Sequence, residues 1–303
     1  MTIFPKVLPD EFILGYWGRI HLLNTFPTSE DTINALIEQF NPPAGGSRRF
    51  EALACSANLN DREFAQNHSL IPSLLAMTSN KAGMLHSLVN TPAVIRRNWR
   101  LLQKPAAYFC PACAEFQQSQ WGFSYWMRRH QLLGVDWCVE HGTSLRSCDE
   151  SAFILKLPSQ IGDSELVAEP DVNEISKPIL KRYSQIMVAL LRGRLRINLS
   201  DAGNIVRPLA MAKGLSTRQR PTSQYLSDYA VDVLPISWLR KLFPKLEMKQ
   251  ANEKYTPLDN TVLAVSARTH AYALAMALLY ESSEVALTAL YQQAGRRNPV
   301  NLN

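Results

Sequence analysis

The chain has 303 residues, of which 46% are hydrophobic, enough apolar surface to fill one large core or two to three ordinary ones. No stretch of 18 apolar residues is free of charges, and the first residues form neither a basic head nor an apolar block, so the sequence predicts neither a membrane span nor a signal peptide. We expect a globular, cytoplasmic protein, and its five cysteines, an odd number, predict reduced thiols rather than a disulfide framework.

The formal net charge of +6 is concentrated in one window. Residues 177–220 carry ten basic side chains against one acidic, whereas the counts are six against eight in 1–91, eight against ten in 92–176 and eight against seven in 221–303. Such a concentration is typical of a protein that meets a polyanion, most often nucleic acid. A solvated basic face without a partner would give the same pattern.

Helical periodicity dominates the first third of the chain. Residues 29–40 begin with a serine and two acidic residues and then place apolar side chains at helical spacing. This pattern predicts an amphipathic helix. From 69 to 102 the apolar residues again recur at three and four, and Pro72 and Pro92 stand where two further helices would begin. We therefore predict a helical N-terminal domain over 1–105.

The next segment has a different texture. Aromatic residues are dense between 108 and 148, three glycines interrupt the pattern, and no helical stripe runs through it, so 106–150 is predicted to form a compact loop-and-ribbon module. Residues 151–176 are polar, acidic and broken by proline, which is typical of a linker.

Helical periodicity returns in a predicted C-terminal domain, 177–303. Its last apolar stretch is rich in alanine and leucine and is expected to form two helices broken near Glu281. The fold class predicted for the chain is therefore mainly α, with a small ribbon module between two helical domains. The C-terminal helices are expected at 178–192, 201–213, 222–232, 236–243 and 266–293.

Four residues of the central module have the spacing of a metal site. Cys110 and Cys113 form a C-x-x-C knuckle, Cys138 and His141 form a C-x-x-H knuckle, and 24 residues separate the two pairs. Two such knuckles supply the four tetrahedral ligands of a structural Zn²⁺ ion, and no position is left for a catalytic water. We therefore predict one structural zinc and no enzymatic activity. A thioredoxin-like redox pair would need a βαβ unit, which the sequence does not offer.

The remaining cysteines and one histidine are weighed against this set. Cys148 and His130 could each replace a ligand, although a bystander role is the simpler interpretation of both. Cys55 has no partner in the sequence and is expected to be a small buried hydrophobe.

Two stretches of the basic window are candidates for nucleic-acid contact. Residues 204–226 resemble a helix-turn-helix with Gly214 in its turn, which would place Lys213, Arg218 and Arg220 at the second helix. Pro221 would break that helix unless the helix begins there, so an accidental match stays open. Basic residues also stand at every second position in 190–200, which suits an extended segment with one basic face; these are Arg192, Arg194 and Arg196. Arginines that pair with carboxylates elsewhere are the alternative.

The residues around the knuckles resemble the signature of the TniQ family. The opening stretch 8–24 is similar to the family's N-terminal segment through Pro9, Glu11, Gly15 and Arg19, and 269–284 resembles a late family segment, with Ala271 where the family favours proline. Relatives often continue into a second cysteine motif, of which only Cys148 remains here. The matching central positions are Cys110, Pro111, Cys113, Trp126, Arg128, Arg129, His130, Gln131, Gly134, Val135, Cys138, His141, Gly142 and Leu145.

The resemblance implies a non-catalytic adaptor that selects the target site of a transposon. Such an adaptor recruits an AAA+ ATPase and, through it, the transposase, to a target named by DNA itself or by a Cascade-type CRISPR effector with its guide RNA, where relatives form homodimers. On this resemblance Glu11 and Arg19 are expected to contact the ATPase. Arg128 and Arg129 are, by their charge, further candidates for nucleic-acid contact, although basic residues in a zinc module can equally contact a protein partner or cap loops. The alternative is a stand-alone, sequence-specific zinc and helix-turn-helix DNA-binding regulator.

Overall fold

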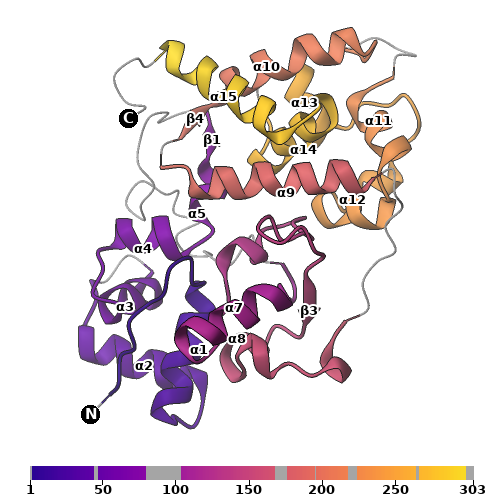
Figure 1. The fold of residues 1–303 in the computed structure, drawn as a ribbon. Coiled ribbons are helices and arrows are strands. Elements are labelled where there is room, and N and C mark those ends of the chain that lie inside the picture. The colour runs from indigo at the N-terminus through magenta and orange to yellow at the C-terminus, as the bar shows by residue number, and fades with distance from the viewer. Residues whose placement is uncertain are drawn as a thin grey trace. The chain divides into compact units, whose positions relative to one another are not determined.

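The computed structural model describes residues 2–43, 47–79, 104–167, 176–194, 196–217, 224–263 and 266–297 (Figure 1). Within these ranges the chain is mainly helical, with two short two-stranded sheets, which confirms the predicted fold class. The chain packs as two compact units. The first contains residues 2–72, 104–132 and 140–167, and the second contains 73–79, 133–139 and the described residues from 176 onward. No helix in the described part of the chain is long and apolar enough to cross a membrane.

The first unit begins with a run of short helices: α1 (Ile13–Asn24), α2 (Ser29–Phe40), α3 (Arg48–Ser56) and α4 (Asp61–His68), followed at its border by α5 (Ile71–Leu75). Helix α2 confirms the predicted bounds. Thr28 Oγ1 accepts a hydrogen bond from the Asp31 N–H at 3.1 Å, and Asp31 Oδ2 accepts one from the Thr28 N–H at 3.0 Å. This capping box satisfies N–H groups that have no partner inside the helix, so it fixes where α2 starts. The helix predicted to begin at Pro92 lies outside the described residues.

Two glycines allow α1 to approach other backbone closely. A Cβ on Gly18 would lie 2.0 Å from the carbonyl oxygen of Phe153 in the short helix α8 (Ala152–Leu155), and one on Gly15 would lie 2.8 Å from the Cβ of Trp126. The ring of Phe153 packs edge to face on Trp126 and Phe12, with centroid distances of 5.1 and 5.4 Å. Helix α8, at the start of the predicted linker, is thus packed against α1, and Phe153 is buried there.

Replacing Gly18 by alanine is expected to destabilise the first unit by about 3 kcal/mol or more, because the new methyl group would meet backbone atoms that cannot rotate away. The measurement is the free energy of urea unfolding. Gly162→Ala is the matched control, since its Cβ would meet nothing closer than 3.6 Å and its φ of −80° suits any residue; a change within about 0.5 kcal/mol is expected. Equal stabilities of the two variants would contradict the close contact.

The central module contains the predicted ribbon and an additional helix. Strands β2 (Ala107–Phe109) and β3 (Arg146–Cys148) pair antiparallel, with Tyr108 opposite Ser147. Between them lies α7 (Pro111–Trp121), which the sequence analysis missed because this helix has no apolar stripe. The sequence nevertheless contains residues typical of its two ends. Pro111 occupies the first helical position, and Gly122 takes a φ of 76° at the C-terminal cap.

The second unit is a helical bundle with one small sheet, in which β1 (Met77–Thr78) pairs parallel with β4 (Ile197–Asn198). Helix α14 (Thr269–Leu279) packs against α9, α10, α13 and α15 and is buried over most of its length. The predicted break near Glu281 is confirmed, since α15 begins at Ser283. Helix α13 was not predicted. The remaining helices are α9 (Lys177–Arg192), α10 (Leu199–Ala212), α11 (Leu226–Val233), α12 (Ile236–Leu242), α13 (Thr256–Leu263) and α15 (Ser283–Arg297).

Candidate metal centre

Cys110 and Cys113 lie at the N-terminal end of α7. Cys110 is the residue before the helix, with extended backbone angles, and Cys113 is in the first turn. Pro111 between them favours this geometry because its fixed φ suits the first helical position. The positive end of the helix stabilises negative charge on both sulfurs, so α7 favours the thiolate form that binds metal.

Cys138 and His141 meet this pair. The ligand atoms of the four residues all lie within 4.8 Å of one another, and the three cysteines are buried. His141 Nδ1 is 3.5 Å from Cys110 Sγ and 3.3 Å from Cys113 Sγ. Tetrahedral zinc with Zn–S of about 2.3 Å and Zn–N of about 2.0 Å places sulfur and nitrogen about 3.5 Å apart. The predicted set is therefore brought together, in a geometry that could hold one metal ion.

Two neighbours contact the sulfurs from outside the set. Thr143 Oγ1 is 3.5 Å from Cys110 Sγ, and Arg129 Nη2 donates to Cys113 Sγ at 3.7 Å. Hydrogen bonds to ligand atoms orient them and offset the charge of three thiolates on one divalent ion. Neither contact was predicted from the sequence.

The two spare candidates lie beside the site without completing it. His130 Nε2 is 3.9 Å from Cys113 Sγ, and burial lowers the pKa of His130 to about 3, so the ring is neutral. Cys148 in β3 donates its S–H to the Ala107 carbonyl oxygen at 3.7 Å, and burial raises its pKa to about 11. Cys55 is exposed on α3, so its predicted burial is wrong: it does not lie on the face of the helix that buries Phe50, Leu53 and Ala54.

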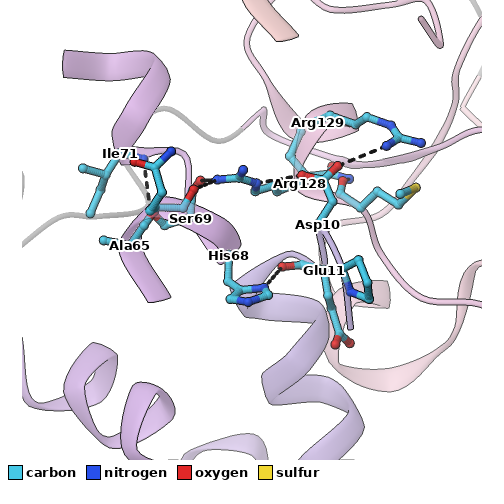
Figure 2. A network of polar contacts seen from close by, with 12 residues as sticks. Asp10, Glu11, Ala65, His68, Ser69, Ile71, Arg128 and Arg129 are labelled. Atoms are coloured by element: carbon cyan, nitrogen blue, oxygen red, sulfur yellow. Dashed lines mark hydrogen bonds and ion pairs between the residues drawn. The ribbon is translucent and has the colours of Figure 1, made fainter. Parts of the chain in front are cut away.

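The carboxylate of Asp10, near the N-terminus, binds two arginines that follow α7, Arg128 and Arg129 (Figure 2). Arg128 Nε donates to Asp10 Oδ1 at 2.7 Å, and Arg129 Nη1 lies 3.4 Å from Asp10 Oδ2. Arg128 Nη1 also donates to the carbonyl oxygens of Gln66 and Ser69, at 2.5 and 3.0 Å. The backbone also joins these two segments. The Phe12 N–H donates to the Trp126 carbonyl at 2.7 Å, and Glu11 pairs antiparallel with Met127.

This placement favours the structural alternative for Arg128 and Arg129, whose contact with nucleic acid or a partner stays a prediction. The two residues are 4% and 9% exposed, and their charges are matched inside the protein by Asp10, with Glu140 3.8 Å from Arg129. A phosphate would have to displace these partners, so the described conformation does not offer either guanidinium to nucleic acid. Asp10 could not be predicted as a partner of these arginines, because they are 118 and 119 residues away along the chain.

Glu11 and Arg19 form a second buried pair. Arg19 Nε and Nη2 donate to the two Glu11 carboxylate oxygens at 2.7 and 2.8 Å, and the Leu8 N–H adds a third donor at 2.9 Å. Burial raises the pKa of Glu11, while Arg19 opposes this shift, and three donors on the carboxylate favour the ionised pair. Glu11 is fully buried and Arg19 is 7% exposed in the described conformation, and their contact with an ATPase stays a prediction.

His68 completes the network in Figure 2 and makes the first unit sensitive to acid. Its Nδ1 is 3.1 Å from the Glu11 carbonyl oxygen, and burial lowers its pKa to about 4, with Arg128 acting in the same direction. The unfolded chain binds a proton near pH 6.5, so stability from neutral His68 is complete above this pH and is lost as the pH falls towards 4.

Lowering the pH from 7.5 to 5 is therefore expected to cost wild type about 2 kcal/mol more unfolding free energy than His68→Gln, whose amide can still donate to Glu11. The two urea unfolding series, at both pH values, give this difference directly. Because both proteins carry the same metal site, protonation of its ligands cancels. Parallel losses in the two proteins would contradict a neutral, buried His68.

The basic window of the second unit is only partly at the surface. Arg192 ends α9 and is exposed, as is Arg194, whereas Arg196 is 4% exposed next to β4. The predicted extended segment with one basic face is therefore wrong in this respect, since α9 continues to Arg192 and β4 turns Arg196 inward.

The helix-turn-helix stays a prediction, because most of its expected second helix lies outside the described residues. Gly214 follows α10 with a φ of 76°, and Lys213 is exposed with its Nζ 4.8 Å above the Tyr229 ring. The next described helix is α11, which begins at Leu226. Arg218 and Arg220 lie outside the described residues, as does any helix that begins at Pro221.

The TniQ family model matches residues 2–145, a range that begins before α1 and includes all four residues of the candidate metal centre. No curated protein matches the chain.

Proposed function

Because the TniQ family model matches residues 2–145, we propose that this protein is an adaptor that selects the target site of a transposon and recruits the transposition machinery to it. The family supports a role in transposition-associated target selection. The observation that carries the proposal is the coincidence of this family match with the four converging ligands, Cys110, Cys113, Cys138 and His141.

The metal chemistry suits an adaptor. A Cys₃His set fills the four positions of a tetrahedral Zn²⁺ ion, so the bound ion would hold the module together and would have no open position for a reacting water. Among the residues that the structure describes, this is the one group of at least three Cys, His, Asp or Glu side chains arranged to hold a metal. The proposal therefore assigns zinc a structural role.

The partners proposed are an AAA+ ATPase, through it the transposase, and target DNA. The exposed Arg192, Arg194 and Lys213 support nucleic-acid contact in the second unit, and Arg218 and Arg220 belong to the same basic window. Within the N-terminal segment, Leu22 and Leu23 are 41% and 48% exposed on α1 and join Glu11 and Arg19 as candidates for ATPase contact. Homodimer formation and a Cascade-type effector with guide RNA remain part of the proposal.

A stand-alone DNA-binding regulator is the second candidate, which the turn at Gly214 and the exposed Lys213 favour. The two functions differ in isolation. A regulator binds a specific site tightly without partners, whereas an adaptor alone binds DNA weakly and with strong salt dependence.

The deciding experiment is a pull-down of the tagged protein from cells that carry the surrounding gene cluster, followed by identification of proteins and RNA in the eluate. An AAA+ ATPase in the eluate supports the adaptor, and Cascade-type subunits with guide RNA identify an RNA-guided target. Leu22→Glu/Leu23→Glu should lose the ATPase, while Val231→Glu, an equally exposed apolar position in α11, should retain it. Specific DNA without the ATPase would favour the regulator.

A further inference from the structure

A cavity of about 640 Å³ opens in the second unit, and none of its lining residues belongs to the candidate metal centre. It lies between the C-terminal end of α12, the first residues of α13 and the segment that leads into α14. Leu242 and Phe243, 5% and 3% exposed, form part of its apolar wall. The cavity therefore offers an apolar side chain a site that is already formed, which reduces the ordering cost of binding.

One polar group in the wall has an unused hydrogen-bonding atom. Asn260 lines the cavity and is 9% exposed; its Nδ2 donates to the Ser266 carbonyl at 3.2 Å, while its Oδ1 is buried without a partner in the described structure. An unsatisfied buried acceptor costs stability unless a ligand supplies a donor. A backbone N–H group that enters the cavity would be such a donor.

The charge of the cavity has one sign. Lys245 and Arg268 line it, both are exposed, and neither makes an ion pair within the described ranges. None of the lining residues is acidic. Arg268 also precedes α14, whose N-terminus has no side-chain cap, so the positive end of that helix adds to the field. His270 faces the same space but is neutral, because burial lowers its pKa to about 4.

The arrangement of the aromatic rings favours a peptide over a nucleobase as the ligand of the cavity. Phe243 meets Tyr255 edge-on, with planes at 84°, and lies 5.4 Å from the His270 ring at 50°. Phe243 and His270 are also buried, so neither presents an open face on which a base could stack. An aliphatic or aromatic side chain needs only the apolar wall.

We propose that this cavity is a docking site for a protein segment in which an apolar side chain is flanked by aspartate or glutamate. The apolar side chain enters beside Leu242 and Phe243, and the carboxylates pair with Lys245 and Arg268. If the proposed adaptor function holds, the segment belongs to a partner in transposition; the binding itself does not depend on that function.

The test pans a random-peptide phage library against the full-length, metal-loaded protein and measures selected peptides by fluorescence anisotropy. Lys245→Glu/Arg268→Glu should weaken binding at least about tenfold, because two attractions become repulsions. The matched control is Lys181→Glu/Arg296→Glu, one lysine and one arginine that are exposed outside the cavity, and it should stay within about twofold. Ala267→Trp, at a half-buried lining position, should also abolish binding by filling the space.

Circular dichroism of each variant shows whether it is folded, and all substituted positions are exposed or half-buried. Enrichment of acidic residues beside an apolar one, with loss in both cavity variants, supports the proposal. Peptides without acidic residues, or equal binding to the cavity variants, overturn it. If Lys245→Glu/Arg268→Glu weakens the binding of single-stranded oligo(dT), and no peptide binds the cavity, the occupant is nucleic acid and the proposal is wrong.

Discussion

Cys138→Ser is expected to remove about one equivalent of metal and to unfold the central module. A hydroxyl is a poor zinc ligand, and the four ligand atoms, which lie within 4.8 Å of one another, would lose one side of the tetrahedron. Structural zinc contributes about 10 to 16 kcal/mol in isolated fingers, so the loss of one ligand should cost a large part of the module's stability. Metal per protein by plasma mass spectrometry and the melting temperature should fall together.

Cys148→Ser is the matched control for this change. Both cysteines are 1% exposed and belong to the same module, but Cys148 bonds to the Ala107 carbonyl and is not among the four ligands. The control should keep its metal, and a serine hydroxyl can still donate to the same carbonyl. Full metal occupancy in Cys138→Ser, or equal metal loss in both variants, would show that the ligand set is different.

Glu11→Gln is expected to destabilise the first unit by about 3–5 kcal/mol, because it leaves the buried Arg19 without a counter-charge. The surface pair Arg49–Glu30 provides a control of the same chemistry, since its side chains are 49% and 50% exposed, and Glu30→Gln should cost at most about 1 kcal/mol. Urea unfolding measures both.

The combined variant Glu11→Leu/Arg19→Met tests whether the stability lost in Glu11→Gln comes from the unpaired charge of Arg19. It removes both charges and should recover much of the stability that Glu11→Gln loses. The ATPase pull-down separates structure from contact: a folded double variant that keeps the ATPase confirms that the pair acts through the fold. Loss of the ATPase with unchanged stability in Glu11→Gln would support the contact role first expected for these residues.

Local signals in the sequence were reliable where neighbouring residues decide the structure. Helix α2 could be predicted because its cap and apolar spacing lie within the same short stretch, and the knuckles because C-x-x-C and C-x-x-H are local devices. Helix α7 escaped detection, although Pro111 and Gly122 marked its ends, since periodicity was the only criterion applied to its interior.

The roles of charged residues could not be predicted in the same way. Arg128 and Arg129 look like a surface pair in the sequence, and only the fold brings Asp10 beside them from 118 and 119 positions away. Arg196 shows the same difficulty, because its alternation with Arg194 suggested one exposed face until β4 turned it inward. Burial of a charge depends on what packs over it, and a single sequence does not state that.

The contacts of Asp10 also set an order of events during synthesis. The segment around Phe12 can pair with Trp126 and Arg128 only after those residues have left the ribosome, and the ligands Cys138 and His141 emerge later still. Until then Glu11 and Arg19 can pair with each other, but the backbone around Trp126 and Met127 that packs against this segment has not yet been synthesised. A nascent chain stalled before Trp126 should therefore expose its amino-terminal segment to proteases, and metal uptake would complete the unit that the first dozen residues began.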